Sequence, residues 1–230
     1  SFKQGTEFHG WGSDTGASYT HPFMPPTDFD ALNPVEAYLA EYTKSRFDQT
    51  VCPQVALFAD NLAPKQITTP EYAGSTNYGY HLDAGKFAAL LQKHCTEQLG
   101  VTQVVANVTA VLCKPNGDID RLKTDRTDDL NGDLFIDCSG THGLLINGLY
   151  NIGFIDRADT LFNNRAIAAQ TPYVDETDPI ASCTHSTAQS AGWIWDIGLP
   201  TRRGTGYVFS TQHQSDDEAE RTLRQYIERT

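Results

Sequence analysis

Two tryptophans separated by one residue are the first feature of the sequence that could do chemistry. Trp193 and Trp195 lie in the segment AGWIWDIGLP and are two of the three tryptophans in the chain. On a β-strand, residues two apart face the same side, so this pair would form a continuous aromatic wall. Such a wall commonly packs in a core, and it can instead line a ligand pocket or tunnel. Gly192 and Gly198 slightly favour a ligand, because glycine lets other groups approach closely.

A second candidate site lies where the apolar residues 134–138 run into Ser139 and Gly140. We predict a short buried strand here, and open α/β sheets bind cofactors at the ends of such strands. A buried strand followed by a plain tight turn is the alternative. The complete dinucleotide-binding pattern G-x-G-x-x-G is absent, because the segment HGWGSDTG, with Gly10 and Gly12, has its third glycine one place late.

Residue type and position alone assign no role to Lys3 or His21. A lysine near a terminus is usually solvated, and a lone histidine is usually not a ligand. The sequence contains neither a G-x-S-x-G nucleophile motif nor an H-E-x-x-H zinc motif. Its five cysteines are scattered, odd in number and without a C-x-x-C pair, which indicates neither a disulfide framework nor a zinc site. We therefore identify no metal ligands from the sequence.

The composition describes a globular chain of 230 residues, with 39% hydrophobic and 20% charged residues. This length allows one domain or two small ones. The net charge of −12 argues against nucleic acid or an anionic membrane as a partner, since both require a basic surface. No apolar run is long enough to span a membrane, and residues 1–10 lack the apolar core of a signal peptide. The expected location is the cytoplasm, where cysteines stay reduced.

Periodicity and turn signals predict a mixed α/β fold. Residues 1–80 are rich in Pro, Gly, Tyr and Phe and should form ordered loops with a short helix near residues 34–46. A helix should follow, capped by Asp83 and ended by Gly100. The remaining expected elements are an extended segment 101–113, a hairpin turn at Asn116–Gly117, strands at 192–199 and 204–211, and a helix starting at Ser215 with a Ser215–Glu218 capping box.

Taken together, these segments resemble the flavin-dependent tryptophan halogenase family. The similarity runs from Phe2 to the end of the chain, and the family's W-x-W-x-I-P signature reads WIWDIG here, with Gly198 in place of the final proline. The other matching segments, in the family's order, are SFKQGTEFHGW, YTHPF, YGYHLDA, LGVTQVVANV, GDLFIDCSGTHGLLIN, NNRAIA and GTGYVFS. The resemblance implies an oxidoreductase that uses reduced FAD, oxygen and chloride or bromide to halogenate an indole-type substrate such as tryptophan.

The resemblance also implies roles for individual residues. Lys3 matches the family's essential lysine, which would place the electrophile either by a hydrogen bond from its ammonium to hypohalous acid or by forming a haloamine. His21 and Phe23 match an H-x-F motif beside the substrate ring. The two tryptophans, Trp193 and Trp195, would wall the tunnel through which hypohalous acid travels to the substrate. Three further residues would lie at the FAD, namely Val108, Ser139 and Gly140.

The resemblance further implies a central portion of a longer enzyme. The family begins with a G-x-G-x-x-G unit and ends beyond W-x-W with a glutamate and a Ser-Thr-Gly halide segment, and this sequence contains neither. We therefore expect an incomplete FAD/NAD(P)-binding-like domain with an inserted substrate-side region, in which strand 134–138 exposes apolar surface. The expected regions are a substrate-side loop region at 1–80, part of the FAD-binding domain at 81–150, and a substrate-side sheet with the tryptophans and closing helix at 151–230.

The implied partners are a separate flavin reductase, which supplies reduced FAD transiently, and a small aromatic substrate; a homodimer is left open. Two other functions remain from the sequence. One is a non-catalytic α/β module that binds an apolar small molecule with its tryptophan wall. The other is a flavin monooxygenase relative that hydroxylates its substrate, a reaction that has no need of Lys3.

Overall fold

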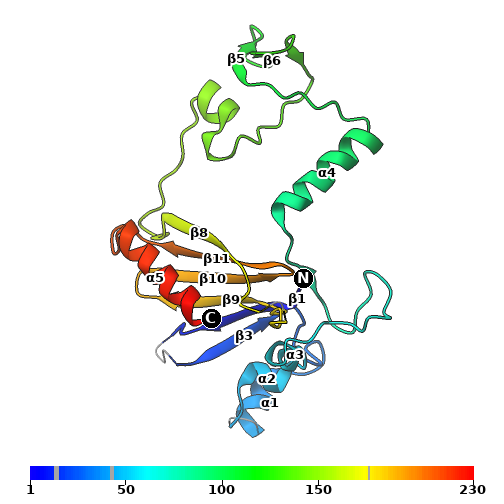
Figure 1. Ribbon diagram of the computed structural model, residues 1–230, viewed down its shortest axis with the longest axis vertical. Helices are drawn as coiled ribbons and strands as arrows, with labels where there is room; N and C mark the ends of the chain where they lie inside the picture. The colour runs from blue at the N-terminus through cyan, green and yellow to red at the C-terminus, as the bar shows by residue number, and fades with distance from the viewer. Residues whose placement is uncertain (13–15, 42–43, 176) are drawn as a thin grey trace. The chain divides into compact units, whose positions relative to one another are not determined.

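The computed structural model describes residues 1–12, 16–41, 44–175 and 177–230. It has the expected mixed α/β fold and divides into two compact units (Figure 1). The first unit contains residues 1–86 and 158–230, and the second contains residues 87–157. The three functional regions expected at 1–80, 81–150 and 151–230 stay a prediction.

A six-stranded sheet forms the centre of the first unit. Its strand order is β3-β2-β9-β10-β11-β8, and all neighbours are antiparallel except the parallel pair β2 and β9. Its strands are β2 (Gly5–His9), β3 (Ser18–Pro22), β8 (Arg165–Thr171), β9 (Thr184–Gln189), β10 (Gly192–Leu199) and β11 (Arg202–Phe209). The parallel pairing places β2, from the start of the chain, beside β9.

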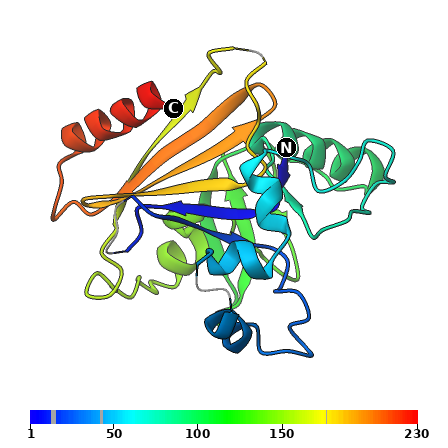
Figure 2. The ribbon, with the colours of Figure 1, turned by 90° about the horizontal axis from the view of Figure 1, so that it is seen from below.

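Helix α5 (Asp216–Arg229) packs against one face of this sheet, which we call the α5 face (Figure 1 and Figure 2). The expected capping box at Ser215 and Glu218 is confirmed. The hydrophobic core lies between helix and sheet and consists of Ile194, Tyr207, Phe209, Ala219 and Leu223, with Tyr226 and Ile227 packed against it. Alternation along β10 sends every second side chain to this core and the others to the opposite face.

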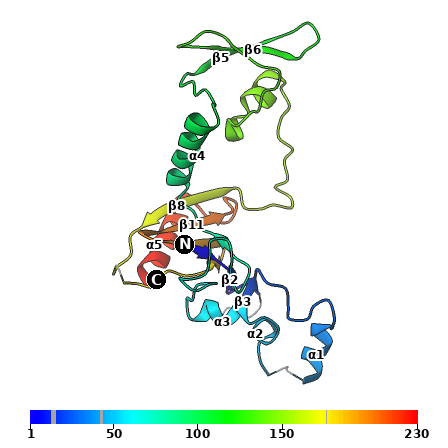
Figure 3. The same cartoon turned by 90° about the vertical axis from the view of Figure 1, so that its right-hand side faces the viewer.

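Short elements complete the first unit. Strands β1 (Phe2–Lys3) and β4 (Gly79–Tyr80) form a two-stranded sheet. The helix expected near residues 34–46 is shorter, α1 (Pro34–Glu41), and is followed by α2 (Phe47–Val51) and α3 (Gln54–Ala59). Helices α2 and α3 contact β3 (Figure 3). These contacts place the start of α3 next to the chain leaving β3.

The second unit contains most of α4 (Ala84–Gln98) and a small sheet of β5 (Val108–Cys113), β6 (Ile119–Thr124) and β7 (Leu130–Asn131). As expected, Asp83 accepts the backbone N–H of Lys86 at the start of α4. Gly100 follows the helix at a φ of 69°, which favours glycine. The hairpin turn at Asn116–Gly117 is also confirmed, since it connects β5 to β6.

Two strand predictions in the second unit are wrong. Residues 101–107 are irregular, and the strand begins only at Val108. Residues 134–138 form no strand, because no strand in the described part of this unit pairs with them. Leu134 and Ile136 are each 79% exposed, so the expected apolar surface is present without the expected ladder. A 3-10 turn (Gly140–His142) and a π-helix (Leu144–Leu149) follow.

Two further observations concern the surface and the cysteines. Across the described residues, no helix combines the length and the apolar character that a membrane crossing needs. All five cysteines are free, and Cys52 and Cys183 are the buried ones. Burial raises the pKa of the Cys183 thiol to about 12, so this side chain stays protonated and packs as a small hydrophobic group.

Candidate active site

The tryptophan pair lies on the sheet face opposite α5. Trp193 and Trp195 are both on β10, half-buried, with ring centroids 6.2 Å apart. Ile194 and Asp196 alternate with them and are buried on the α5 face. The prediction that both rings share one strand and one side is therefore confirmed. Their role as a tunnel wall stays a prediction.

Aromatic residues of neighbouring strands extend this tryptophan face. The Trp11 ring lies 6.3 Å from Trp193 and 5.8 Å from Phe8, and the Trp11 indole N–H donates to the Ser186 carbonyl. Phe8 stacks on Tyr19 of β3 with a centroid distance of 5.0 Å. The pair thus belongs to a layer of aromatic rings contributed by β10, β2, β3 and the segment after β2.

A glycine on β11 makes room for one of the two indoles. Gly206 pairs with Trp195 in the antiparallel ladder. A Cβ atom on Gly206 would lie 2.0 Å from Cζ2 of Trp195, far inside van der Waals contact. The six-membered ring of the indole therefore occupies the place that a side chain at position 206 would take, and its orientation depends on the absence of that side chain.

Lys3 lies on β1, next to the ring of Phe23. The pairing of β1 with β4 places Lys3 opposite Gly79. The Lys3 ammonium lies 5.8 Å from the centroid of the Phe23 ring, within cation–π range. Phe23 is itself fixed by its backbone N–H, which donates to the Gln4 carbonyl. Lys3 and Phe23 are thus brought together by neighbouring backbone segments.

His21 and Phe23 share a cavity of about 540 Å³, which Pro22, Met24, Phe47 and other residues also line. Lys3 does not line this cavity. The Lys3 ammonium contacts the Phe23 ring from β1, because the pairing with β4 holds Lys3 beside Gly79.

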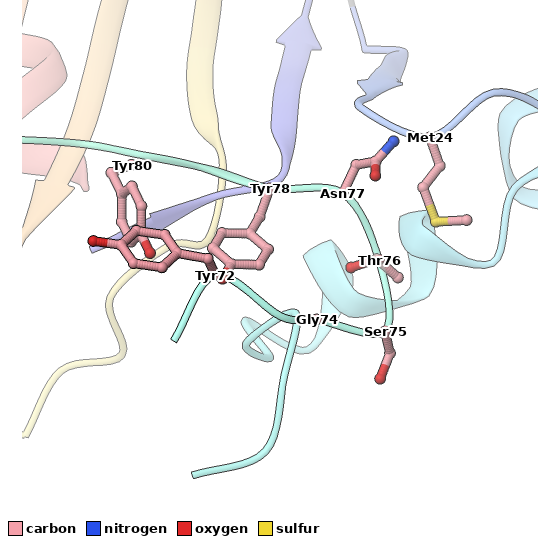
Figure 4. A pocket seen from close by; sticks show the side chains of 8 residues that line it. All are labelled: Met24, Tyr72, Gly74, Ser75, Thr76, Asn77, Tyr78 and Tyr80. Atoms are coloured by element: carbon pink, nitrogen blue, oxygen red, sulfur yellow. The ribbon is translucent and has the colours of Figure 1, made fainter. Parts of the chain in front are cut away.

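A second cavity, of about 350 Å³, lies beside β4, and three of its eight lining residues are tyrosines, Tyr72, Tyr78 and Tyr80 (Figure 4). Tyr78 and Tyr80 contact each other and Phe2, with ring centroids 5.3–5.8 Å apart. The tyrosine-rich sequence EYAGSTNYGY could have indicated this aromatic cavity, but the spacing of its tyrosines is typical of neither a helix nor a strand. These rings extend the aromatic surroundings of β1, the strand that carries Lys3.

Two buried glutamines that the sequence analysis missed hold this region together. Gln4 and Gln54 are both fully buried. The Gln54 amide accepts the Met24 N–H at 3.0 Å and donates to the Asn77 carbonyl at 2.7 Å and to Gln4 Oε1 at 3.4 Å. Gln4 Nε2 donates to the Leu62 carbonyl. The network ties β1 to the segment after β3 and to the loop before β4.

Replacing Gln54 by leucine should lower the free energy of unfolding of the full-length protein by about 3 kcal/mol. The reason is that the Met24 N–H and the Asn77 carbonyl lose their buried partner, which costs about 1–3 kcal/mol for each group. Gln49→Leu on α2 is the matched control, because Gln49 is exposed and its change should stay within about 0.5 kcal/mol. Urea unfolding measures both. Equal effects of the two variants would contradict the role of the network.

His81 is a buried neutral side chain close to β1. Its Nε2 and the Thr184 hydroxyl are hydrogen-bonded at 2.8 Å, and its backbone N–H donates to the Ser1 carbonyl. Burial, together with the positive charge of Lys3, lowers the pKa of His81 to about 4. At neutral pH His81 is therefore uncharged and adds no second cation beside Lys3.

The residues expected at the FAD lie in the second unit. Val108 begins β5 and is half-buried, next to a β-bulge. Ser139 precedes the 3-10 turn, and its hydroxyl donates to Asp137 and accepts the Leu144 N–H. Asp137 also accepts the N–H groups of Leu145 and Ile146, and these hydrogen bonds, that from the Ser139 hydroxyl above all, lower its pKa to about 2.

Gly140 leaves this turn open to a ligand. Its φ is 67°, a conformation that favours glycine, and a Cβ atom built there would meet no atom within 4 Å. The ionised Asp137 holds the backbone on both sides of the turn in place. Ser139 and Gly140 thus form an ordered stretch of accessible backbone, which fits a ligand that lies against main-chain atoms.

Solved structures identify this fold. The crystal structure of a tryptophan halogenase from Shewanella frigidimarina matches 99% of this chain and 44% of its own, with a TM-score of 0.92 and 45% identity. That of tryptophan 6-halogenase SttH from Streptomyces toxytricini matches 98% of this chain and 45% of its own, with a TM-score of 0.91 and 33% identity. The chain thus has the fold of part of a flavin-dependent halogenase.

The sequence comparison agrees. The family model described as tryptophan halogenase matches residues 1–230, so the chain belongs to the tryptophan halogenase family. SttH is 32% identical over 99% of this chain and 47% of its own length. Tryptophan 7-halogenase RebH from Lentzea aerocolonigenes is 36% identical over 78% of this chain and 33% of its own. The chain spans less than half the length of each of these relatives.

Proposed function

We propose that the protein containing this chain is an FAD-dependent halogenase that acts on an indole-type aromatic substrate. The observation that carries this proposal is the placement of the Lys3 ammonium 5.8 Å from the Phe23 ring, in a chain that belongs to the tryptophan halogenase family throughout. Relatives named for halogenating tryptophan at position 6 or 7 support an indole ring as the substrate. The halide is chloride or bromide.

Lys3 acts on hypohalous acid in this proposal. Its ammonium donates a hydrogen bond to the oxygen of the acid, which makes the halogen more electrophilic and fixes its position. The ring carbon then takes the halogen and loses a proton, and the oxygen leaves as water. Phe23 and His21 line the neighbouring cavity, where aromatic and edge contacts can orient a planar ring.

The tryptophan face bounds the passage of the acid. Trp193 and Trp195 offer no strong hydrogen-bond acceptor and keep water from the apolar surface that they cover. Excluding water protects a reactive intermediate before it meets the substrate. Trp11 extends the same surface, although the sequence indicated no role for it.

The second unit would contribute to FAD binding. The accessible backbone at Ser139 and Gly140, and the chain at Val108, are the residues that would hold the cofactor. Oxygen would be the oxidant, and bound reduced FAD and the halide would each give it two electrons, so that hypohalous acid and water form. A separate flavin reductase that delivers the reduced FAD is part of the proposal.

A halogenation assay of the full-length protein tests this function. The mixture contains FAD, a flavin reductase, NADH, bromide or chloride, and a panel of indoles that includes tryptophan. We expect a product with one hydrogen replaced by halogen, which mass spectrometry identifies from the isotope pattern. A hydroxylated product without halogen would indicate a monooxygenase instead. An indole that binds but is never converted would indicate a binding module.

A further inference from the structure

Three metal-ligating side chains converge on the α5 face of the sheet, opposite the tryptophans. Glu7 and His9 are two residues apart on β2 and therefore point to the same side. His185 on β9 pairs with Glu7 in the parallel ladder. On its other edge β9 pairs with β10, where Asp196 is the partner of His185. Sheet pairing thus brings together Glu7, His9 and His185, and the three potential ligand atoms lie within 4.8 Å of one another.

The distances between these atoms are those of a tetrahedral metal site. His9 Nε2 lies 3.2 Å from His185 Nδ1, and Glu7 Oε2 lies 3.5 Å from His185 Nδ1 and 3.7 Å from His9 Nε2. Zinc bonds of about 2.0–2.2 Å at tetrahedral angles separate neighbouring ligand atoms by about 3.3–3.6 Å. Octahedral ligands at the same bond length would lie about 2.8–3.1 Å apart. The observed triangle fits the tetrahedral arrangement better.

Hydrogen bonds among Glu7, His9 and His185 do not satisfy all three of these atoms at once. The Glu7 carboxylate only accepts, and each neutral imidazole nitrogen either donates or accepts. If the His185 Nδ1 proton points to Glu7, it is not available to His9, and a second proton on His9 Nε2 would face the first across 3.2 Å. One cation at the centre would instead be bound by a lone pair from each of the three atoms.

A fourth coordination position is open to a cavity. His9 and His185 line a cavity of about 650 Å³, together with Thr187, Asp196 and Tyr226. The side chains of Glu7, His185 and His9 are 23%, 30% and 36% exposed, so the cluster is shielded but still reachable by an ion. Two histidines, one glutamate and a free fourth position are a ligand set that zinc sites use.

We propose that Glu7, His9 and His185 bind one divalent zinc-type ion, with a water or small ligand from the adjacent cavity in the fourth position. The ligand set of two imidazoles and one carboxylate favours an ion that prefers nitrogen over one that prefers oxygen alone, such as Mg²⁺. The site lies on the opposite sheet face from Trp193 and Trp195. It is therefore separate from the halogenation site proposed above.

Isothermal titration of the chelator-treated, tag-free, full-length protein with Zn²⁺ tests the proposal. We expect one ion per chain at micromolar affinity or tighter, and much weaker binding of Mg²⁺. Glu7→Gln and His185→Asn should each weaken Zn²⁺ binding at least about a hundredfold, because direct ligands contribute more than the groups that only orient them. His213→Asn is the matched control, since His213 is exposed and outside the cluster. It should leave the affinity unchanged.

Spectroscopy of the wild-type protein makes the test independent of how the variants fold. Co²⁺ substituted for Zn²⁺ should show the intense visible absorption of a tetrahedral site, and X-ray absorption at the zinc edge should show two imidazoles and no sulfur. No stoichiometric Zn²⁺ binding, sulfur ligation, or full binding by both folded ligand variants would overturn the proposal. The readout is metal binding, so a failed halogenation assay would not affect it.

Discussion

Replacing Lys3 by alanine in the full-length protein is expected to abolish halogenation of the aromatic substrate while oxygen uptake continues. The Lys3 ammonium is held beside the Phe23 ring at 5.8 Å, where it would position the electrophile. In the proposed mechanism, formation of hypohalous acid does not require the lysine. Loss of this positioning should lower product formation on the order of a thousandfold or more, because the electrophile is then free in water and is no longer held next to the ring carbon. NADH-coupled oxygen consumption and product detection are measured together.

Lys65 offers a matched control for this experiment. Its ammonium lies 5.8 Å from the centroid of the Tyr78 ring, the same distance as that from Lys3 to Phe23, and donates to the Pro70 carbonyl. Lys65→Ala should keep both oxygen uptake and product. Lys3→Arg should restore halogenation only in part, because a planar guanidinium presents its donors differently from an ammonium. Near-normal product from Lys3→Ala would disprove the mechanism, and loss of oxygen uptake would make Lys3 a structural residue.

Sequence patterns that extend over only a few residues predicted the local structure correctly. The two-residue spacing of Trp193 and Trp195 placed both rings on one side of β10, because side chains alternate along any strand. The Ser215–Glu218 capping box and the Gly100 helix end likewise depend on residues a few positions apart. The role expected of Lys3, by contrast, came from the family resemblance, since a lysine near a terminus carries no local signal.

Pairing between distant segments was beyond the sequence patterns. His9 and His185 are 176 residues apart and meet only because β2 pairs in parallel with β9. Gln4 and Gln54 are 50 residues apart, and their contact has no local sequence signature either. At residues 134–138 the sequence predicted a strand that the structure does not contain. Their apolar composition is typical of a strand, but a strand also needs a neighbouring strand to pair with.

The tryptophan face depends on Gly206, a residue to which no sequence pattern assigned a role. Gly206→Ala should lower the free energy of unfolding by about 1–3 kcal/mol, because overpacking forces side chains or backbone to shift. The new Cβ would lie 2.0 Å from Cζ2 and 2.2 Å from Cη2 of Trp195, both in a rigid ring. The contact is relieved when the indole turns away from β11 or when the β11 backbone shifts. Urea unfolding and tryptophan fluorescence of the folded variant measure the two effects.

Gly204→Ala separates this steric effect from the general effect of replacing a glycine in a strand. Gly204 lies two residues away on β11, on the same face, and a Cβ there meets only Arg202 Nη1 at 3.8 Å. The control should be neutral or stabilising by up to about 1 kcal/mol, since glycine is costly inside a strand.

If Trp195 bounds the passage of hypohalous acid, Gly206→Ala should also reduce halogenated product per oxygen consumed, whereas Gly204→Ala should not. Unchanged fluorescence and stability in Gly206→Ala would mean that the indole is not held against β11. A normal product yield from a variant whose indole has moved would remove Trp195 from the passage, because its orientation would then make no difference to delivery of the halogen.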